Sequence, residues 1–257
     1  MIFVITVLLL FLSTLSFVVY LFNHREEEKN LKNLRWLKTL GFTFLGSAFV
    51  LSLLGLFVWI PPKVSIFTIL ATTLIGIYLF TLTFFRKGNL NNLAAVVSST
   101  ALLFSLLGLS VGTFPLKEHL LMFHVGVSLL TFSLLLLSAV FSFLRILSEK
   151  NLKQGNLNLP LNIPLSVVVK LERRLFFFGF VFLTVELILS LLWSQARLGE
   201  VVFDSRVCAT LLLWLYYNLL FHLERFGFSF FRRYFSHLNL FGAILIVLSL
   251  LLTRHRF

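Results

Sequence analysis

The sequence predicts an all-α polytopic membrane protein with about eight transmembrane helices and both termini outside the cytoplasm. Hydrophobic residues make up 59% of the 257 residues and charged residues only 12%, and the mean hydropathy is +0.99. A water-exposed surface needs more polar residues than this composition supplies. Two further observations favour the same fold class: a series of long apolar runs, and basic residues concentrated in alternate loops.

Eight apolar runs approach or reach the length of a membrane-spanning helix. A helix rises about 1.5 Å per residue, so about 20 apolar residues cross the roughly 30 Å of hydrocarbon. The predicted spans are residues 2–22, 37–59, 64–85, 90–114, 119–147, 174–193, 207–223 and 237–253. The first run lacks the basic segment and the small-residue cleavage site of a signal peptide, so we expect it to remain as a helix.

The basic residues predict the orientation of these helices. Sixteen of the 22 Lys and Arg residues lie in the connections after the first, third, fifth and seventh spans. The opposite side has only six, namely Lys63, Lys117, Arg197, Arg206, Arg254 and Arg256. Because short loops rich in Lys and Arg stay in the cytoplasm, both termini are predicted to lie outside it. The net charge of +12 is thereby explained as membrane topology rather than nucleic-acid binding.

The chain is predicted to consist of two membrane parts. Residues 1–114 form an N-terminal part of four helices, and residues 115–257 form a C-terminal part of four. Asn, Gly and Pro interrupt the helical pattern after the fifth span, which predicts a cytoplasmic linker at residues 148–174. The sequence LSVVVKLERRL, residues 165–175, is expected to lie at the membrane interface as a short separate segment.

Motifs of soluble enzymes do not occur in the sequence. It has no phosphate-binding loop, no Gly-rich dinucleotide turn, no paired His of a metalloprotease and no nucleophile elbow. Cys208 is the single cysteine, which excludes an internal disulfide and a cysteine metal cage. Any chemistry would therefore depend on ionisable side chains inside the spans, where their cost in lipid makes them candidates for function.

Three ionisable residues lie at membrane depth: His124, Glu186 and His222. His124 is predicted about 7 Å inside the outer boundary, because the fifth span begins near His119. His222 lies about 24 Å along the seventh span, near the cytoplasmic face, so the two imidazoles cannot share one metal ion. Each imidazole has a structural alternative, which is a hydrogen bond to a neighbouring helix. Glu186 could relay protons or accept a bond from a Ser or Trp.

Three stretches of the C-terminal part have a recognisable order of residues. The first is FPLKEHLLMFHVGVSLLTFSLLLLSAVFSFL, in which a His opens a long apolar run. The second, KLERRLFFFGFVFLTVELILSLLW, contains Leu171, Glu172, Gly179, Phe180, Leu183, Thr184 and Trp193. The third, FDSRVCATLLLWLYYNLLFHLERFGF, contains Asp204, Arg206, Trp214, Tyr216, His222 and Gly227. In this order they resemble the cytochrome c assembly family, haem-handling membrane proteins that include the CcsA-type synthase subunit and the eight-span HemX-type proteins.

The resemblance implies a haem cofactor and a location in the bacterial inner membrane. His124 matches the family's outer-leaflet axial ligand, and His222 matches an inner-leaflet His that guides haem arriving from the cytoplasm. A second outer ligand would be His119 or His255. The resemblance also implies a cofactor-binding role for Trp193, Asp204, Arg206 and Trp214.

The resemblance is incomplete in the loop between the sixth and seventh spans. The family has a Trp-rich external haem platform there, whereas WSQARLGEVVFDSR retains only Trp193, Gly199, Asp204 and a basic Arg206. We therefore expect an accessory protein that binds or passes haem rather than a complete synthase enzyme. Its expected partners are membrane lipid, haem, and other cytochrome c assembly subunits or a cytoplasmic haem-biosynthesis enzyme. The alternatives are a scaffold or regulator that keeps the fold without haem, and a transporter that uses Glu186.

Overall fold

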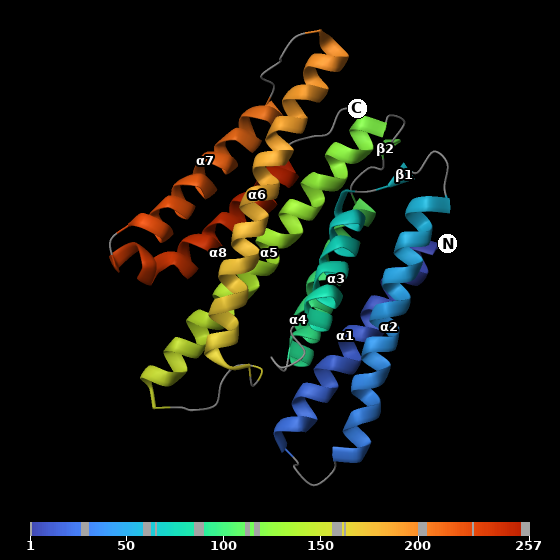
Figure 1. The fold of residues 1–257 in the computed structure, drawn as a ribbon. Helices are drawn as coiled ribbons and strands as arrows, with labels where there is room; N and C mark the ends of the chain where they lie inside the picture. Colours follow the sequence, from blue (N-terminus) through green and yellow to red (C-terminus); the bar gives the residue numbers. More distant parts are fainter. Residues whose placement is uncertain are drawn as a thin grey trace. The chain divides into compact units, whose positions relative to one another are not determined.

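The computed structural model describes the chain except for residues 1, 27–30, 59–62, 65, 85–89, 111–113, 116–118, 156–160, 162, 200–204, 228 and 253–257. The described residues form eight α-helices, which confirms the predicted all-α fold (Figure 1). Seven of these helices are long and apolar enough to cross a membrane. The remaining one, α3 (Ile66–Phe84), is a shorter apolar helix. The chain divides into two compact units, Met1–Leu116 and Lys117–Phe257.

The first unit is built from four α-helices. They are α1 (Ile2–Glu26), α2 (Leu31–Val58), α3 and α4 (Ala94–Ser110), with the 3₁₀ turn η3 (Leu90–Leu93) leading into α4. A two-residue strand β1 (Lys63–Val64) pairs antiparallel with β2 (Phe114–Pro115). The helix α1 packs against α2 and α4, and α4 also packs against α3. Buried aromatic residues such as Phe17 and Tyr78 fill the interior of this unit.

The second unit is a four-helix bundle. It consists of α5 (His119–Lys153), α6 (Leu165–Leu198), α7 (Ser205–Phe226) and α8 (Ser229–Leu252). The most extensive packing joins α5 to α6 and α8, and α7 to the same two helices (Figure 1). Successive helices run in opposite directions, so the end of α5, the start of α6, the end of α7 and the start of α8 share one end of the bundle.

The connection between α5 and α6 is shorter than the linker expected at residues 148–174. The helix α5 continues to Lys153 and α6 already begins at Leu165, so only residues 154–164 connect them. The expectation of a separate interfacial segment at residues 165–175 is wrong, because these residues form the first turns of α6. Val168, Leu171 and Leu175 follow a helical spacing and are all buried, which favours a continuous helix.

A glycine lies at a position where α5 and α6 pack closely. A Cβ atom added to Gly179 would lie 2.6 Å from Cδ2 of Leu135 and 3.3 Å from its backbone nitrogen. Leu135 has no exposed surface and therefore little room to move. Small residues allow close backbone approach in membrane helix pairs, where packing and polar contacts replace the hydrophobic effect.

A buried carboxylate ties three helices of the second unit together. Glu172 of α6 has no exposed surface, and one of its oxygens accepts hydrogen bonds of 2.6 Å from both Ser142 of α5 and Ser236 of α8. The other oxygen lies 3.0 Å from Nη1 of Arg145. Asn239 of α8 extends the network by donating to Ser142 at 2.9 Å. Glu172 falls within the linker expected at residues 148–174, whereas the structure places it in α6.

Gly179→Ala is expected to destabilise the protein by about 1–3 kcal/mol, since the added methyl group must displace a buried side chain. The measurement is equilibrium unfolding of the purified protein in mixed detergent micelles. Gly126→Ala is the matched control, because nothing lies within 4 Å of a Cβ at that α5 position. If the two variants unfold at the same denaturant concentration, the close approach at Gly179 does not limit packing.

Arg145→Met is expected to lower the free energy of unfolding by about 3 kcal/mol, because it leaves the buried Glu172 carboxylate without its cation. Adding Glu172→Gln to this variant should restore part of the loss, since the double variant buries no unpaired charge. The same unfolding assay measures both changes. A single variant as stable as the wild-type protein would contradict this account of the network.

Candidate functional site

His124 and Glu186 face each other across the interface of α5 and α6. The His124 side chain is 18% exposed and the Glu186 side chain 5% exposed. The His124 Nε2 atom lies 4.0 Å from Oε1 of Glu186, which is beyond hydrogen-bond distance. The two groups are thus neighbours without being bonded, near the end of the bundle at which α5 begins.

Ser128 connects this pair. It follows His124 by one turn of α5, and its Oγ atom donates to Oε1 of Glu186 at 3.1 Å. The Ser128 Oγ atom also lies 2.8 Å from the backbone carbonyl oxygen of His124, so the single hydroxyl hydrogen of Ser128 is shared between two acceptors. The sequence left open a bond to Glu186 from a Ser or from a Trp. The structure contains the bond from a Ser on the adjacent helix. Sequence reasoning did not single out Ser128, although its spacing of four residues from His124 places both on one face.

Two polar atoms of this cluster have no hydrogen-bond partner among the residues that the structure describes. They are Nδ1 of His124 and Oε2 of Glu186, and both are buried. A buried polar group without a partner costs free energy, and such groups are rare in native structures. The cluster therefore retains an unused ligand or donor position on the imidazole and an unused acceptor on the carboxylate.

The Ser128–Glu186 contact repeats the geometry of the Ser142–Glu172 contact. The two serines are 14 residues apart on α5, and the two glutamates are 14 residues apart on α6. Leu135 and Gly179 touch midway between them, seven residues from each pair. This spacing of seven is the period of helices that pack at a shallow left-handed angle. The register between α5 and α6 therefore positions both carboxylates, which lie about 21 Å apart along the helices.

His222 lies at the other end of the bundle, in the last turns of α7. Its side chain is exposed. The imidazole centroid is 5.5 Å from the ring of Phe221 and 6.0 Å from the ring of Phe226, with which it is nearly parallel. His124 and His222 are therefore not brought together, and each has its own surroundings.

The remaining residues of the expected set differ in what the structure describes of them. The Trp214 indole donates a 3.0 Å hydrogen bond to Oγ1 of Thr184, so its polar edge joins α7 to α6. Trp193 is partly buried on α6. Asp204 and His255 lie outside the described residues, as do the side chains of His119 and Arg206.

Protein side chains alone do not form a metal centre in the described part of the chain. No group of three or more His, Cys, Asp and Glu residues there is arranged to hold a metal ion. A porphyrin requires less of the protein, because it supplies four nitrogen ligands and leaves only axial positions to imidazoles. The isolated His124 and His222 are compatible with that requirement.

Comparison with known proteins assigns the family. The model of the family described as "Cytochrome C assembly protein" matches residues 48–256. The match extends beyond the C-terminal part in which the resemblance lies and includes α3 and α4 of the first unit. No curated protein and no solved structure matches the chain. Because the family model covers well over half of the sequence, the chain belongs to the cytochrome c assembly protein family.

Proposed function

We propose that this protein binds haem and passes it on during cytochrome c biogenesis, with His124 as the residue that would hold the haem iron and His222 as a second contact. Family membership supports a role in cytochrome c biogenesis. Beyond that role, the proposal adds the two haem contacts and a location in the bacterial inner membrane. In this proposal the protein is an accessory that acts with other assembly subunits or with a haem-biosynthesis enzyme, without making a covalent bond itself.

The observation that supports a haem ligand is the state of the His124 imidazole. Neither ring nitrogen has a hydrogen bond to a described residue, and Nδ1 is buried without a partner. Haem iron binds a neutral imidazole, and a carboxylate or carbonyl usually holds the other ring nitrogen. A shift of about 1 Å would bring Oε1 of Glu186 within hydrogen-bond distance of His124 Nε2. Glu186 would then be that acceptor, and Nδ1 would be left for the iron. Bound haem would supply an iron that changes oxidation state.

His222 supports a second contact for a different reason. Its imidazole is exposed, and the rings of Phe221 and Phe226 flank it. Aromatic rings offer a porphyrin apolar area and stacking. Because this end of the bundle is predicted to face the cytoplasm, His222 suits an early contact and His124 a later one. The proposal therefore implies movement of haem toward the outer leaflet.

His124→Ala is expected to abolish the Soret absorption of protein purified from haem-replete cells, because without this imidazole the protein would not retain haem. His222→Ala should reduce haem content without changing the Soret position of the haem that remains. His237→Ala, an exposed His on α8, is the matched control and should leave the spectrum unchanged. A colourless wild-type preparation would overturn the proposal and favour a scaffold or regulator.

Glu186→Gln is expected to weaken haem affinity by about 10–100-fold, the usual effect of removing the acceptor that orients a ligating imidazole. The amide keeps the bond from Ser128 but loses the charge that holds a ring N–H. Haem titration of the apoprotein measures the affinity, and the Soret position reports the ligand directly. Glu149→Gln, at a half-exposed carboxylate of α5, is the control. Equal affinities in the two variants would remove Glu186 from the site.

A further inference from the structure

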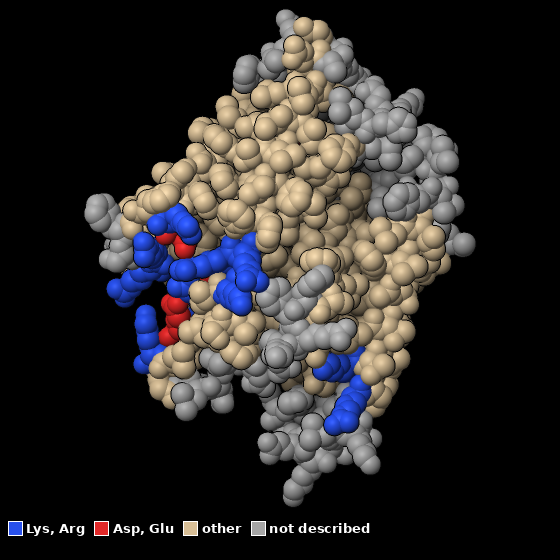
Figure 2. Space-filling model, in the orientation of Figure 1, with Lys and Arg blue, Asp and Glu red and all other residues tan. Residues whose placement is uncertain are grey.

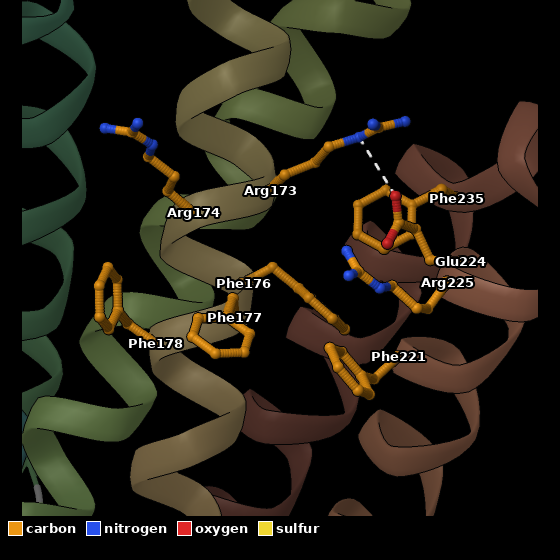
Figure 3. Close-up of a pocket in the computed structure, with 9 residues that line it drawn as sticks. All are labelled: Arg173, Arg174, Phe176, Phe177, Phe178, Phe221, Glu224, Arg225 and Phe235. Carbon is orange, nitrogen blue, oxygen red and sulfur yellow. Dashed lines mark ion pairs between the residues drawn. The ribbon is translucent and has the colours of Figure 1, made fainter.

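A cavity of about 500 Å³ opens at the end of the second unit where α7 ends and α8 begins. Figure 3 shows its lining, which comes from the early turns of α6, the last turns of α7 and the start of α8. Figure 2 shows that Lys and Arg gather at this end of the second unit, while most of its visible surface is neutral. We call the cavity the Arg–Phe pocket, because three Arg and five Phe residues line it together with Glu224.

The polar side of the Arg–Phe pocket has an excess of positive charge. Nε of Arg173 lies 3.3 Å from Oε1 of Glu224, and the Arg173 side chain is still 46% exposed. The guanidinium group of Arg225 points to the same side as this pair, whereas Arg174 points away across α6 (Figure 3). Arg225 has no hydrogen bond or ion pair with another described residue. Two guanidinium groups thus face one carboxylate.

The apolar side of the pocket follows directly along α6. Phe177 is 45% exposed, and its ring lies 6.1 Å from that of Phe221 on α7. Phe176 and Phe235 close the inner wall with ring centroids 5.0 Å apart. Charged and aromatic residues are therefore separated by about one turn of helix, roughly 5 Å. This change from polar to apolar matches the change from lipid headgroup to acyl chain.

We propose that the Arg–Phe pocket binds an anionic phospholipid. Its phosphodiester would lie between Arg173 and Arg225, and the upper part of one acyl chain would lie along Phe177 and Phe221. Guanidinium groups bind phosphate oxygens in bidentate fashion, and basic pockets between helices on the cytoplasmic side are suited to anionic headgroups. Arg173 and Arg225 together carry one positive charge more than Glu224 neutralises, which favours a headgroup of net negative charge, such as phosphatidylglycerol, over a zwitterionic one.

Haem is a poorer occupant of this pocket. His222 is not part of the lining, although Phe221 on one side of it in the sequence is. Phe221 and Arg225 are four residues apart and share one face of α7, whereas His222 and Phe226 share the next face. A porphyrin held by His222 would lie on that second face. The lipid site and the proposed haem contact are therefore on adjacent faces of α7, with Phe221 between them.

The test uses the full chain in nanodiscs of phosphatidylcholine with and without about 20 mol% phosphatidylglycerol, an anionic fraction sufficient for headgroup recognition. Native mass spectrometry counts the phosphatidylglycerol molecules that the released protein retains. Arg225→Gln and Arg173→Gln should each reduce retention about fivefold, the contribution expected of one interfacial Arg. Lys170→Gln removes an exposed charge one turn from Arg174, outside the lining, and should retain as much lipid as the wild-type protein.

Several outcomes would overturn the proposal. Equal loss in Lys170→Gln would indicate diffuse attraction to the charged end, and equal retention of phosphatidylcholine would indicate no headgroup selection. Displacement by soluble glycerol phosphate would indicate a site for free phosphate.

The Soret band of Arg225→Gln separates this site from the haem proposal. An unchanged band with lost lipid supports a separate lipid site, whereas a lost band with unchanged lipid assigns the pocket to haem. Because Arg225 has no described partner, its variant is expected to fold.

Discussion

The complete pairing of one buried carboxylate is the constraint on which the second unit depends. Glu172 has no contact with solvent, and burying an unpaired charge in an apolar bundle would cost several kcal/mol (about 3–5 when one partner is missing). Its partners come from two other helices, Ser142 and Arg145 on α5 and Ser236 on α8. A slip of one residue in any of these helices would remove a partner. The network therefore fixes the register of the bundle.

The same register accounts for the candidate site at the opposite end. Seven-residue spacing relates Ser142–Glu172, Leu135–Gly179 and Ser128–Glu186, so the structural contact and the candidate site are two positions of one repeating interface. They differ in how fully the carboxylate is paired. Glu172 has a guanidinium and two hydroxyl groups, whereas Glu186 has one hydroxyl and an imidazole 4.0 Å away. The incompletely paired end is the one suited to accept a ligand.

The basic residues at the end of the bundle near Glu172 have different roles, although counting Lys and Arg in each loop treats them alike. Arg145 points inward and neutralises Glu172. Arg173 pairs with Glu224 at the surface, and Lys170 is exposed. The positive-inside distribution describes all three as topology signals. Their contacts differ because one lies inside the bundle, one at a helix junction and one on the outer face of α6.

The sequence by itself determined the fold class, the number of helices and the family, because hydropathy, length and motif order are properties of consecutive residues. It also placed His124 and His222 far apart, since depth follows from position along a helix. The tertiary structure decided the partners: Ser128 for Glu186, Arg145 for Glu172, Thr184 for Trp214. It also decided that residues 165–175 extend α6 instead of forming a separate segment. These outcomes depend on the register between helices, which many packing contacts set together and no local pattern specifies.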